Sequence, residues 1–502
     1  MQPSKWVFTR RDLMRHAGRA AIGCAGAAVL RDLNWMQAAA AQGGGPGYKA
    51  LVCVFLFGGN DSQNMIVPIT GTEYDAYAAA RGGFAEANGL ALPLGSLLPI
   101  SPAGLGANSF GLHPAMINLA TLFNTDKKLA VVANAGPLLA PTSLAQYQGR
   151  SVPLPPQLFS HSDMQMHWQT MRPDVPADTG WGGRMADVFR SASSGLLPVS
   201  TGLGGGNIFM KGDVVTSYTV TPMKYASGVI DTSSRIARTA DADISWNWTG
   251  TGANRYPQDV FVNNNNEMRS NLLEQQYANV NKASLDVGAF VTNAMYNTSG
   301  STYTLKNAVP GVWPTTNRLA AQLHSVAAMI AARQALGVTR QIFFVSLGGF
   351  DNHGDQFGRN AVSGNKTLLS GKHFDLLSQL DVALNAFYRA TASMGVSSNV
   401  TTMTMSDFGR TLRSNGQGSD HGWGGHHLVL GGAVNGGRFA GTFPTVALGT
   451  STDVGEGRLL PAVASDAYAA TLASWLGASP SELATIFPNL SRFSTQSLNL
   501  ML

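Results

Sequence analysis

Aspartate and histidine residues recur in this 502-residue sequence where apolar runs give way to glycine-rich or polar stretches. The set comprises Asp61, His161, Asp351, His353, Asp407, Asp420, His421, His426 and His427. Mixed carboxylate and imidazole ligands suit zinc, manganese or a zinc/magnesium pair. Two metal ions about 4 Å apart could clamp the attacking and leaving oxygens of a displacement at phosphorus. The residues therefore predict a divalent-metal site, with zinc expected first and manganese, magnesium or calcium as alternatives.

Ordinary structural roles are open for the same residues. Asp61 could cap the segment that follows it, Asp407 could form an ion pair with Arg410, and Asp163 fits the N-cap of a helix over 164–171. Arg410 has a second alternative, because its guanidinium could make a bidentate contact with a phosphoryl or sulfuryl group and stabilise charge in the transition state.

The elements that must position these residues are apolar runs and amphipathic stretches in alternation. The expected strands, typical of a parallel sheet buried on both faces, are 50–57, 129–133, 341–347 and 400–405. The expected helices are 114–123, 181–191, 319–336, 366–394 and 466–475, the last capped by Ser465. This order predicts an α/β fold with a doubly wound, mostly parallel sheet and helices on both faces. Ligands of such sheets lie beyond the carboxyl ends of the strands.

The first 41 residues have the pattern of a twin-arginine signal peptide. Arg10-Arg11 is followed by an apolar run over 20–30, and small residues at 38–41 offer a cleavage site. The run is too short to span a bilayer, so we expect no stable membrane span after processing. We expect the twin-arginine export machinery as a partner and a periplasmic or secreted location. This route carries folded proteins, which favours a bound cofactor.

Charge argues against nucleic acid as a partner. The chain holds 34 basic and 29 acidic residues, a formal net charge of +5. The signal segment alone contributes +4 of this charge, from six basic and two acidic residues. The mature protein is therefore nearly neutral and has no basic cluster to neutralise a run of phosphates.

The amino-acid composition changes between about residue 200 and residue 312. Gly204-Gly205-Gly206 and Asn263 to Asn266 stand among scattered Thr and Tyr, with few apolar runs. We expect this segment to be an insertion, either a cap over the site or a solvated surface excursion.

Several stretches, spread in order over nearly the whole mature chain, resemble a bacterial family. They are 55–61, 160–162 with 168–170, 348–353, and 406–411 followed by Asn415 and 420–422. The sequence is similar in these stretches to the twin-arginine-exported proteins catalogued as domain of unknown function 1501. That family resembles the alkaline phosphatase and sulfatase superfamily, whose doubly wound sheet presents two metal ions and a nucleophile. The resemblance implies an alkaline phosphatase-like domain over 47–502.

The resemblance also implies ligand sets. Asp61 and Asp407 would hold one metal, while Asp351, His353 and His421 would hold or adjoin the other.

One departure from the superfamily pattern bears on these ligands. Its usual Asp-His pair is here Asp407-Phe408, so a histidine ligand must come from elsewhere, and His421 or His426 are the candidates.

The superfamily's phosphatases use a Ser or Thr at a helix start, made nucleophilic by a metal. Ser162 is the best placed candidate, with Ser160 and Ser62 as alternatives. We expect Ser162, His161 and Arg410 to act in catalysis. A formylglycine-type sulfatase is rejected, because neither Cys53 nor Ser151 has the required arginine in its context.

The sequence therefore predicts an exported metal-dependent hydrolase that acts on a small-molecule or polymer phosphate ester or related ester. The alternative is a non-catalytic periplasmic or surface protein that keeps the fold as a binding or structural module with a degenerate metal site. An oxidoreductase with an organic cofactor would fit the export route. However, the glycine-rich stretch 202–207 misses the dinucleotide-binding spacing.

Overall fold

The computed structural model describes residues 47–84, 88–193, 196–215, 217–222, 225–226, 229–230, 237–238, 271–299, 302–314, 316–359, 366–367 and 369–502. The predicted signal peptide at 1–41 lies outside these residues. Backbone contacts divide the chain into Met1–Tyr48 and Lys49–Leu502, and the second unit carries the fold.

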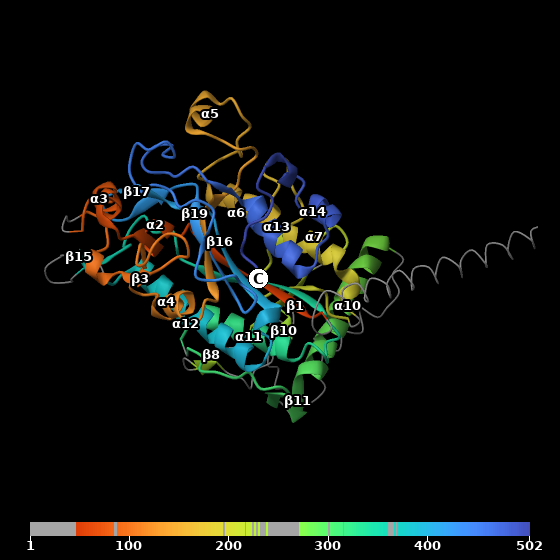
Figure 1. Ribbon diagram of the computed structural model, residues 1–502. Helices are drawn as coiled ribbons and strands as arrows, with labels where there is room; N and C mark the ends of the chain where they lie inside the picture. Colours follow the sequence, from red (N-terminus) through yellow and green to blue (C-terminus); the bar gives the residue numbers. More distant parts are fainter. Residues whose placement is uncertain are drawn as a thin grey trace, which may run out of the picture. The chain divides into compact units, whose positions relative to one another are not determined.

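A ten-stranded sheet forms the centre of the Lys49–Leu502 unit (Figure 1). Its strands, in spatial order, are β10 (Ala237–Arg238), β7 (Tyr218–Thr221), β6 (Ser200–Gly202), β13 (Arg340–Gly348), β1 (Lys49–Phe57), β16 (Val400–Ser406), β19 (Gly425–Gly431), β5 (Leu129–Gly136) and β20 (Phe439–Ala440), with β21 (Val463–Ala464) also paired to β5. The ladders around β1, β13, β6 and β7 are parallel, whereas β19 runs against both β16 and β5 and β10 runs against β7. The sheet is therefore mostly parallel, as predicted.

The register of the three central strands aligns their carboxyl ends. Phe57 at the end of β1 lies opposite Gly348 of β13, and Leu56 lies opposite Ser406 of β16. The loops that begin at residues 58, 349 and 407 consequently leave the sheet at one edge. This is the edge at which doubly wound sheets bind their ligands.

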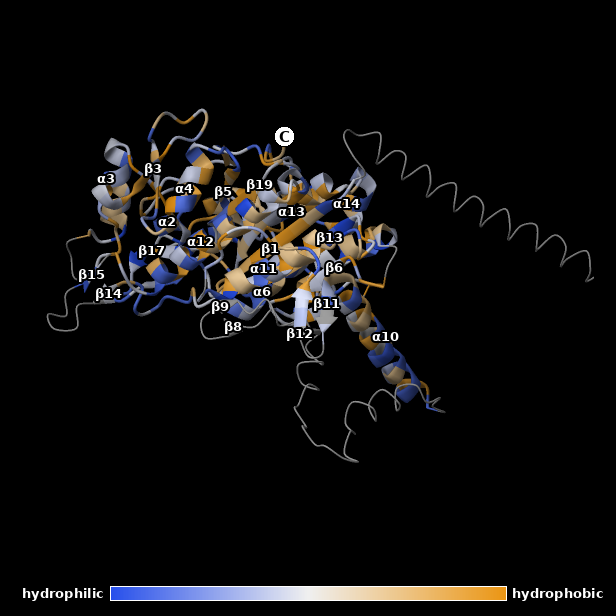
Figure 2. Cartoon of the chain, turned by 90° about the horizontal axis from the view of Figure 1, so that it is seen from below, coloured by the Kyte–Doolittle hydropathy of each residue, from blue (hydrophilic) through white to orange (hydrophobic). Residues whose placement is uncertain are grey.

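Helices cover both faces of the sheet (Figure 1). α4 (Ile117–Asn124), α11 (Arg318–Ala331) and α12 (Lys372–Ser393) pack together on one face. α7 (Trp181–Val188), α13 (Ser465–Leu476) and α14 (Pro480–Ile486) pack together on the other. On this second face, Leu51 and Phe55 of β1 share an apolar cluster with Tyr468 of α13. Figure 2 shows the apolar character of the central strands. The predicted fold class is confirmed.

Several predicted boundaries are wrong. The helix expected over 366–394 begins only at Lys372, because 366–367 pairs as β15 with β14 (Gly358–Arg359). α6 spans His161–Thr170, so Asp163 lies inside its first turn and is not the N-cap. Ser465 is likewise the first residue of α13 and gives no side-chain capping bond.

The segment 200–312 is only partly described. Its first strands, β6 and β7, extend the central sheet next to β13. Further along lie a long helix, α10 (Leu272–Met295), and a hairpin of β11 (Tyr296–Ser299) and β12 (Thr302–Leu305). A role of this segment as a cap stays a prediction, since residues 231–236 and 239–270 lie outside the described part.

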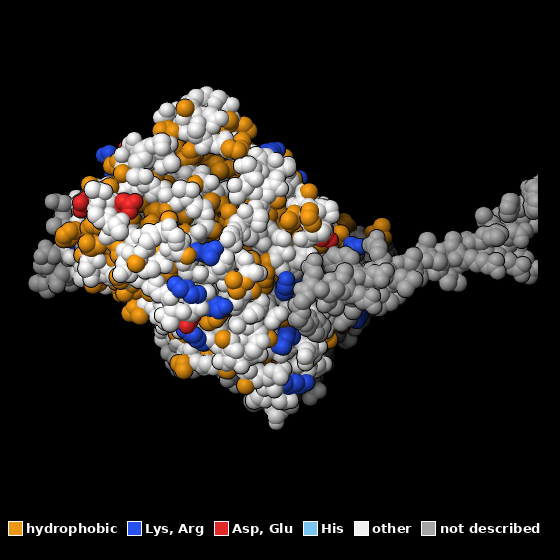
Figure 3. Space-filling view, viewed as in Figure 1, with side chains coloured by type: hydrophobic (Ala, Val, Ile, Leu, Met, Phe, Trp, Pro, Cys, Tyr) orange, Lys and Arg blue, Asp and Glu red, His pale blue; other side chains and the backbone are white. Residues whose placement is uncertain are grey.

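The smaller elements surround this framework. They are α2 (Ser62–Met65), β2 (Ile66–Pro68), α3 (Gly71–Ala80), β3 (Leu98–Ile100), β4 (Phe110–Leu112), α5 (Leu144–Gly149), β8 (Tyr225–Ala226), β9 (Val229–Ile230), β17 (Arg410–Ser414) and β18 (Ser419–His421). Figure 3 shows one face of the molecule, where charged side chains stand apart among uncharged ones. Among the described helices, none combines the length and the apolar character needed to cross a membrane.

Candidate metal centre

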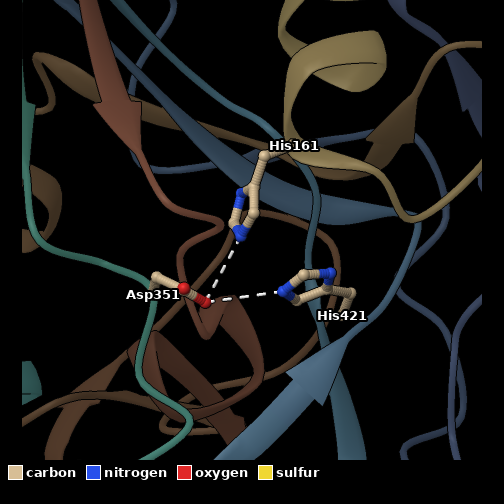
Figure 4. Close-up of side chains that lie close together, drawn as sticks. All are labelled: His161, Asp351 and His421. Carbon is tan, nitrogen blue, oxygen red and sulfur yellow. Dashed lines mark ion pairs between the residues drawn. The ribbon is translucent and has the colours of Figure 1, made fainter.

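Three side chains from separate elements meet at the carboxyl edge of the sheet (Figure 4). His161 begins α6, Asp351 lies in the loop after β13, and His421 ends β18. Their ligand atoms all lie within 4.8 Å of one another. Asp351 Oδ1 is 3.4 Å from His161 Nε2 and 3.5 Å from His421 Nε2. These residues form a candidate metal-binding triad.

A third imidazole lies beside the triad. His353 Nε2 is 3.1 Å from Asp351 Oδ1 and 2.8 Å from His421 Nε2. Three imidazole nitrogens thus approach a single carboxylate oxygen.

The outer nitrogen of each imidazole fixes its tautomer. A carbonyl or an ionised carboxylate can only accept, so each Nδ1 must donate its hydrogen outward. In the neutral imidazoles this leaves a lone pair on each Nε2, and at the 2.8 Å approach of His353 Nε2 to His421 Nε2 the two lone pairs need a proton or a cation between them. The three bonds run from His161 to Asp407 Oδ2 (2.7 Å), from His421 to the Phe159 carbonyl (2.7 Å) and from His353 to Asp420 Oδ1 (2.9 Å). Metal-bound histidines are held in this way in proteins. The donor set therefore fits a divalent cation at the triad.

The buried carboxylate of Asp407 has both oxygens engaged. Oδ1 accepts the Gly58 N–H at 3.1 Å, and Oδ2 accepts His161 Nδ1 and Gln165 Nε2 at 2.7 and 2.8 Å. Asp407 thus lies behind His161, where it orients the imidazole. The ligand role that the resemblance implied for Asp407 stays a prediction. Gln165 was not identified from the sequence. It lies four positions after His161 in α6, so the two side chains share one face of the helix.

Charges around the triad shift its pKa values. The hydrogen bond from His161 to Asp407 raises the pKa of that imidazole against the effect of partial burial. Burial would raise the pKa of Asp351, but the hydrogen bond and charge of Arg410 outweigh it and lower the pKa. Burial, together with the charge of Arg410, lowers the pKa of His421. Asp351 is therefore an anion and His421 a neutral imidazole at neutral pH.

Arg410 is buried beneath the triad and has a carboxylate partner, Asp351, not Asp407. Its other hydrogen bonds go to backbone carbonyls of the loops that form the site. These acceptors are Gly58 (2.7 Å), Gly59 (3.0 Å), Phe350 (3.1 Å) and Ser419 (2.7 Å). The guanidinium thus ties the loops after β1 and β13 to the β17–β18 hairpin. A direct contact with substrate would require it to give up some of these bonds.

Asp61 is buried outside the triad. Its Oδ2 forms an ion pair with Arg81 and accepts Gln356 Nε2 at 2.5 Å. Asp61 is also the N-cap residue of α2, but its side chain makes no capping bond. The structure therefore does not bring Asp61 into the triad, since its Oδ2 is engaged by Arg81 and Gln356. Its buried Oδ1 has no hydrogen-bond partner among the described residues, and a role of Asp61 as a metal ligand stays a prediction.

His426 is also directed elsewhere. Its Nδ1 accepts the Asn134 N–H at 3.0 Å, so Nε2 carries the hydrogen and faces Gln63 Oε1 at 3.2 Å. Burial lowers the pKa of His426 to about 3. The residue lies within the central strand β19, which explains why its nitrogens are used inside the fold. The sequence offered His421 and His426 as the histidine ligand that replaces the one missing after Asp407. Of these two, His421 belongs to the triad and His426 does not.

Phe408, the residue after Asp407, packs against two imidazoles of the site. Its ring lies 4.9 Å from the His161 ring and 4.5 Å from the His421 ring. A Cβ atom on Gly59 would lie 2.3 Å from the Phe408 ring, so only glycine allows this packing. The aromatic ring thus packs against both imidazoles.

The candidate nucleophiles differ in their surroundings. Ser162 is exposed on α6, and its Oγ lies 3.3 Å from Asp163 Oδ2 and 3.2 Å from Ser160 Oγ. Ser62 Oγ accepts the His426 N–H at 2.9 Å inside the fold. Ser160 and Ser162 both adjoin His161 in the sequence, and Ser162 is the more exposed of the two.

Comparisons with known proteins agree with the family resemblance. The family model for a protein of unknown function (DUF1501) matches residues 48–460, and the chain belongs to this family. No curated protein is significantly similar to the sequence.

Two solved structures show a distant similarity to the chain. One is a Bacteroides thetaiotaomicron protein described in connection with the metabolism of multiple glycosaminoglycans, at 11% identity and a TM-score of 0.32 over 88% of this chain and 74% of that one. The other is a mutant of the alkaline phosphatase PafA, at 12% identity and a TM-score of 0.25 over 74% of this chain and 64% of that one.

Proposed function

We propose that the protein is a metal-dependent hydrolase of a phosphate or related ester. The observation that supports this most directly is the approach of three imidazole Nε2 atoms to Asp351 Oδ1, at distances of 3.1 to 3.5 Å. His161, Asp351 and His421 would hold the cation, with His353 beside them. A donor set rich in imidazole favours zinc or manganese over magnesium and calcium, which prefer oxygen ligands.

Each neighbouring residue has a defined task in this proposal. A bound cation would supply Lewis acidity towards an ester oxygen and activate a water molecule. Asp407 keeps the His161 ring in place, and Arg410 keeps the Asp351 carboxylate in place. His353 donates its Nδ1 hydrogen to Asp420, which leaves its Nε2 free to accept a proton next to Asp351.

Two nucleophiles are compatible with this site: the Ser162 hydroxyl and a water molecule. Ser162 follows the ligand His161 directly on α6. The variant Ser162→Ala distinguishes the two nucleophiles, because it loses activity only if the Ser162 hydroxyl attacks the ester.

The deciding experiment combines metal analysis with an ester screen. Purified protein is tested with a phosphomonoester, a phosphodiester and a sulfate ester, alongside the variants Asp351→Asn and His421→Ala. We expect bound metal in the wild type and a loss of activity of at least about 100-fold in both variants, since metal assistance contributes several kcal/mol. Activity that survives both substitutions would refute the proposed site.

A second candidate function is a metal-binding protein without catalysis. It is favoured by one observation: the donors of Arg410 are directed at backbone carbonyls and Asp351, so no free guanidinium faces the triad from this residue. Stoichiometric metal without hydrolysis of any of the three ester classes would support this candidate.

We also propose export by the twin-arginine route, on the basis of the sequence of residues 1–41. Substitution of Arg10 and Arg11 by lysine keeps the charge of the segment. We expect the variant to stay in the cytoplasm while the wild type reaches the periplasm or the medium. Export of both proteins would contradict this route.

A further inference from the structure

We propose that a hollow next to the metal centre binds the non-reacting body of the substrate, and that this body is a ring-bearing organic anion. The role of the hollow as a substrate site rests on the proposed function, but the experiment that tests the hollow measures ligand binding and not hydrolysis. The hollow has a volume of about 600 Å³ and is lined by nine residues between positions 147 and 159, from the end of α5 and the loop that leads to α6. Sites for small organic molecules usually measure about 300–1,000 Å³.

One residue connects the hollow to the metal centre. Phe159 lines the hollow, and its carbonyl oxygen accepts the Nδ1 hydrogen of His421 at 2.7 Å. His161 follows two residues later at the start of α6. A molecule in the hollow would therefore lie beside the loop that positions two of the three triad residues.

Polar and apolar residues share the lining of the hollow, and its apolar part is firmly supported. Tyr147, Leu154, Leu158 and Phe159 pack against a buried cluster that also contains Phe408, the side chain packed against two imidazoles. Aromatic and aliphatic walls of this kind favour a flat organic ring.

The charge of the hollow selects an anion. Its nine described lining residues include one cation, Arg150, and no acidic residue. Arg150 is exposed at the C-terminal end of α5. An exposed guanidinium beside aromatic and aliphatic side chains pairs well with a carboxylate or a similar anion carried by the ring.

The backbone of the lining is held in an uncommon conformation. Arg150, Gln157 and Phe159 have φ values of 48°, 50° and 72°, in the left-handed region that residues other than glycine rarely adopt. Bonds and packing hold Phe159 there, since its carbonyl accepts from His421 and its ring lies 5.3 Å from the Arg458 guanidinium carbon. Such conformations persist where the surroundings fix them, often at ligand sites. The hollow is thus preformed.

The test measures binding of 2-naphthoate, a fluorescent ring-bearing carboxylate, to the full-length protein. We expect wild type to bind it and Arg150→Gln to raise the Kd about tenfold, which equals about 1.4 kcal/mol. The neutral analogue 2-naphthalenemethanol should show no such difference between the two proteins. Arg190→Gln is the matched control, because Arg190 is another exposed arginine, in the short helix η2 (Arg190–Ala192), and does not line the hollow.

The outcomes separate this inference from the proposed hydrolysis. Equal naphthoate affinity in wild type, Arg150→Gln and Arg190→Gln, or no binding to any of them, overturns the hollow as an anion site even if esters are cleaved. Binding that depends on Arg150 in a protein that cleaves no ester supports the hollow and refutes the hydrolase. Asp351→Asn should keep naphthoate binding while it loses hydrolysis.

Discussion

The Nδ1 hydrogen of His161 is donated to Asp407 Oδ2 over 2.7 Å, although the two residues are 246 positions apart in the sequence. One residue begins a helix and the other follows a central strand. Because this bond engages Nδ1, Nε2 is the nitrogen that faces Asp351, at 3.4 Å from Oδ1. The orientation of the candidate metal ligand thus depends on a buried carboxylate that does not itself face the site.

Replacement of this carboxylate should weaken metal binding without abolishing it. We expect Asp407→Asn to raise the Kd for zinc about 10- to 100-fold, the usual effect of removing the partner of a metal-bound histidine. Calorimetric titration measures the change. Asp466→Asn is the matched control, since Asp466 is another fully buried aspartate and its side chain accepts from the Ser465 hydroxyl, not from an imidazole. Equal affinities in Asp407→Asn and wild type would show that Asp407 does not position a ligand.

The absence of a side chain at Gly59 should be essential for the site. A Cβ atom there would lie 2.3 Å from the Phe408 ring, and the φ of 82° already disfavours other residues. We expect Gly59→Ala to displace Phe408 and to lower zinc affinity by at least about tenfold, as a misplaced supporting residue does. Gly104→Ala is the control for backbone strain, because Gly104 has a similar φ of 85° but open space around it. A loss of zinc affinity in Gly59→Ala alone then reports the contact with Phe408. Zinc affinity unchanged in Gly59→Ala would remove Phe408 from the account of the site.

Loss of the Arg410 guanidinium should destabilise the whole unit. Its bonds satisfy backbone carbonyls of the loops after β1 and β13 and of strand β18, and each buried acceptor left unpaired costs about 1–3 kcal/mol. We expect Arg410→Met to lower the free energy of unfolding by about 3–5 kcal/mol, measured by urea denaturation. Arg413→Met should change it by less than about 1 kcal/mol, because the Arg413–Glu456 pair is exposed. A small effect at Arg410 would show that the loops are held by other contacts.

Acid should unfold the protein partly through its buried histidines. Burial lowers the pKa of His427 to about 3, whereas an unfolded histidine has a pKa near 6.5. The unfolded chain therefore binds more protons in this interval, so the stabilising contribution is complete above about pH 6.5 and is lost as the pH falls towards 3. Each such histidine contributes a slope of about 1.4 kcal/mol per pH unit.

The variant His427→Phe tests this contribution. His427 packs against Trp168 and Tyr468, with ring centroids at 4.6 and 5.8 Å, so an aromatic replacement preserves the contacts. The slope of unfolding free energy between about pH 6 and 4 should fall by about 1.4 kcal/mol per pH unit. An unchanged slope would mean that His427 does not titrate on unfolding.

The sheet was predictable from the sequence because its strands are continuous apolar runs. β1, β13 and β16 lie within one or two residues of the expected ranges, since a strand buried on both faces leaves a strong signal. Helix starts were less predictable: a hairpin delays α12 to Lys372, and α6 begins at His161 without a capping side chain.

The candidate site was predictable in part. The ends of neighbouring parallel strands must meet at one edge, so the grouping of Asp351 with the loop of Asp407 followed from the fold class. The direction of each side chain did not follow. Asp61 forms an ion pair with Arg81, and Asp407 accepts a hydrogen bond from His161. Nothing in the sequence pattern marks Arg81 as the partner of Asp61, because the two residues meet only in the folded chain.

The central claim is that His161, Asp351 and His421 hold a divalent cation. Anomalous diffraction from crystals of zinc-loaded protein, recorded at the zinc absorption edge, tests it most directly. We predict one strong peak about 2.0–2.2 Å from His161 Nε2, His421 Nε2 and a carboxylate oxygen of Asp351. A zinc peak at Asp61 or His426 instead, or no peak within ligand distance of the three residues, would contradict the account.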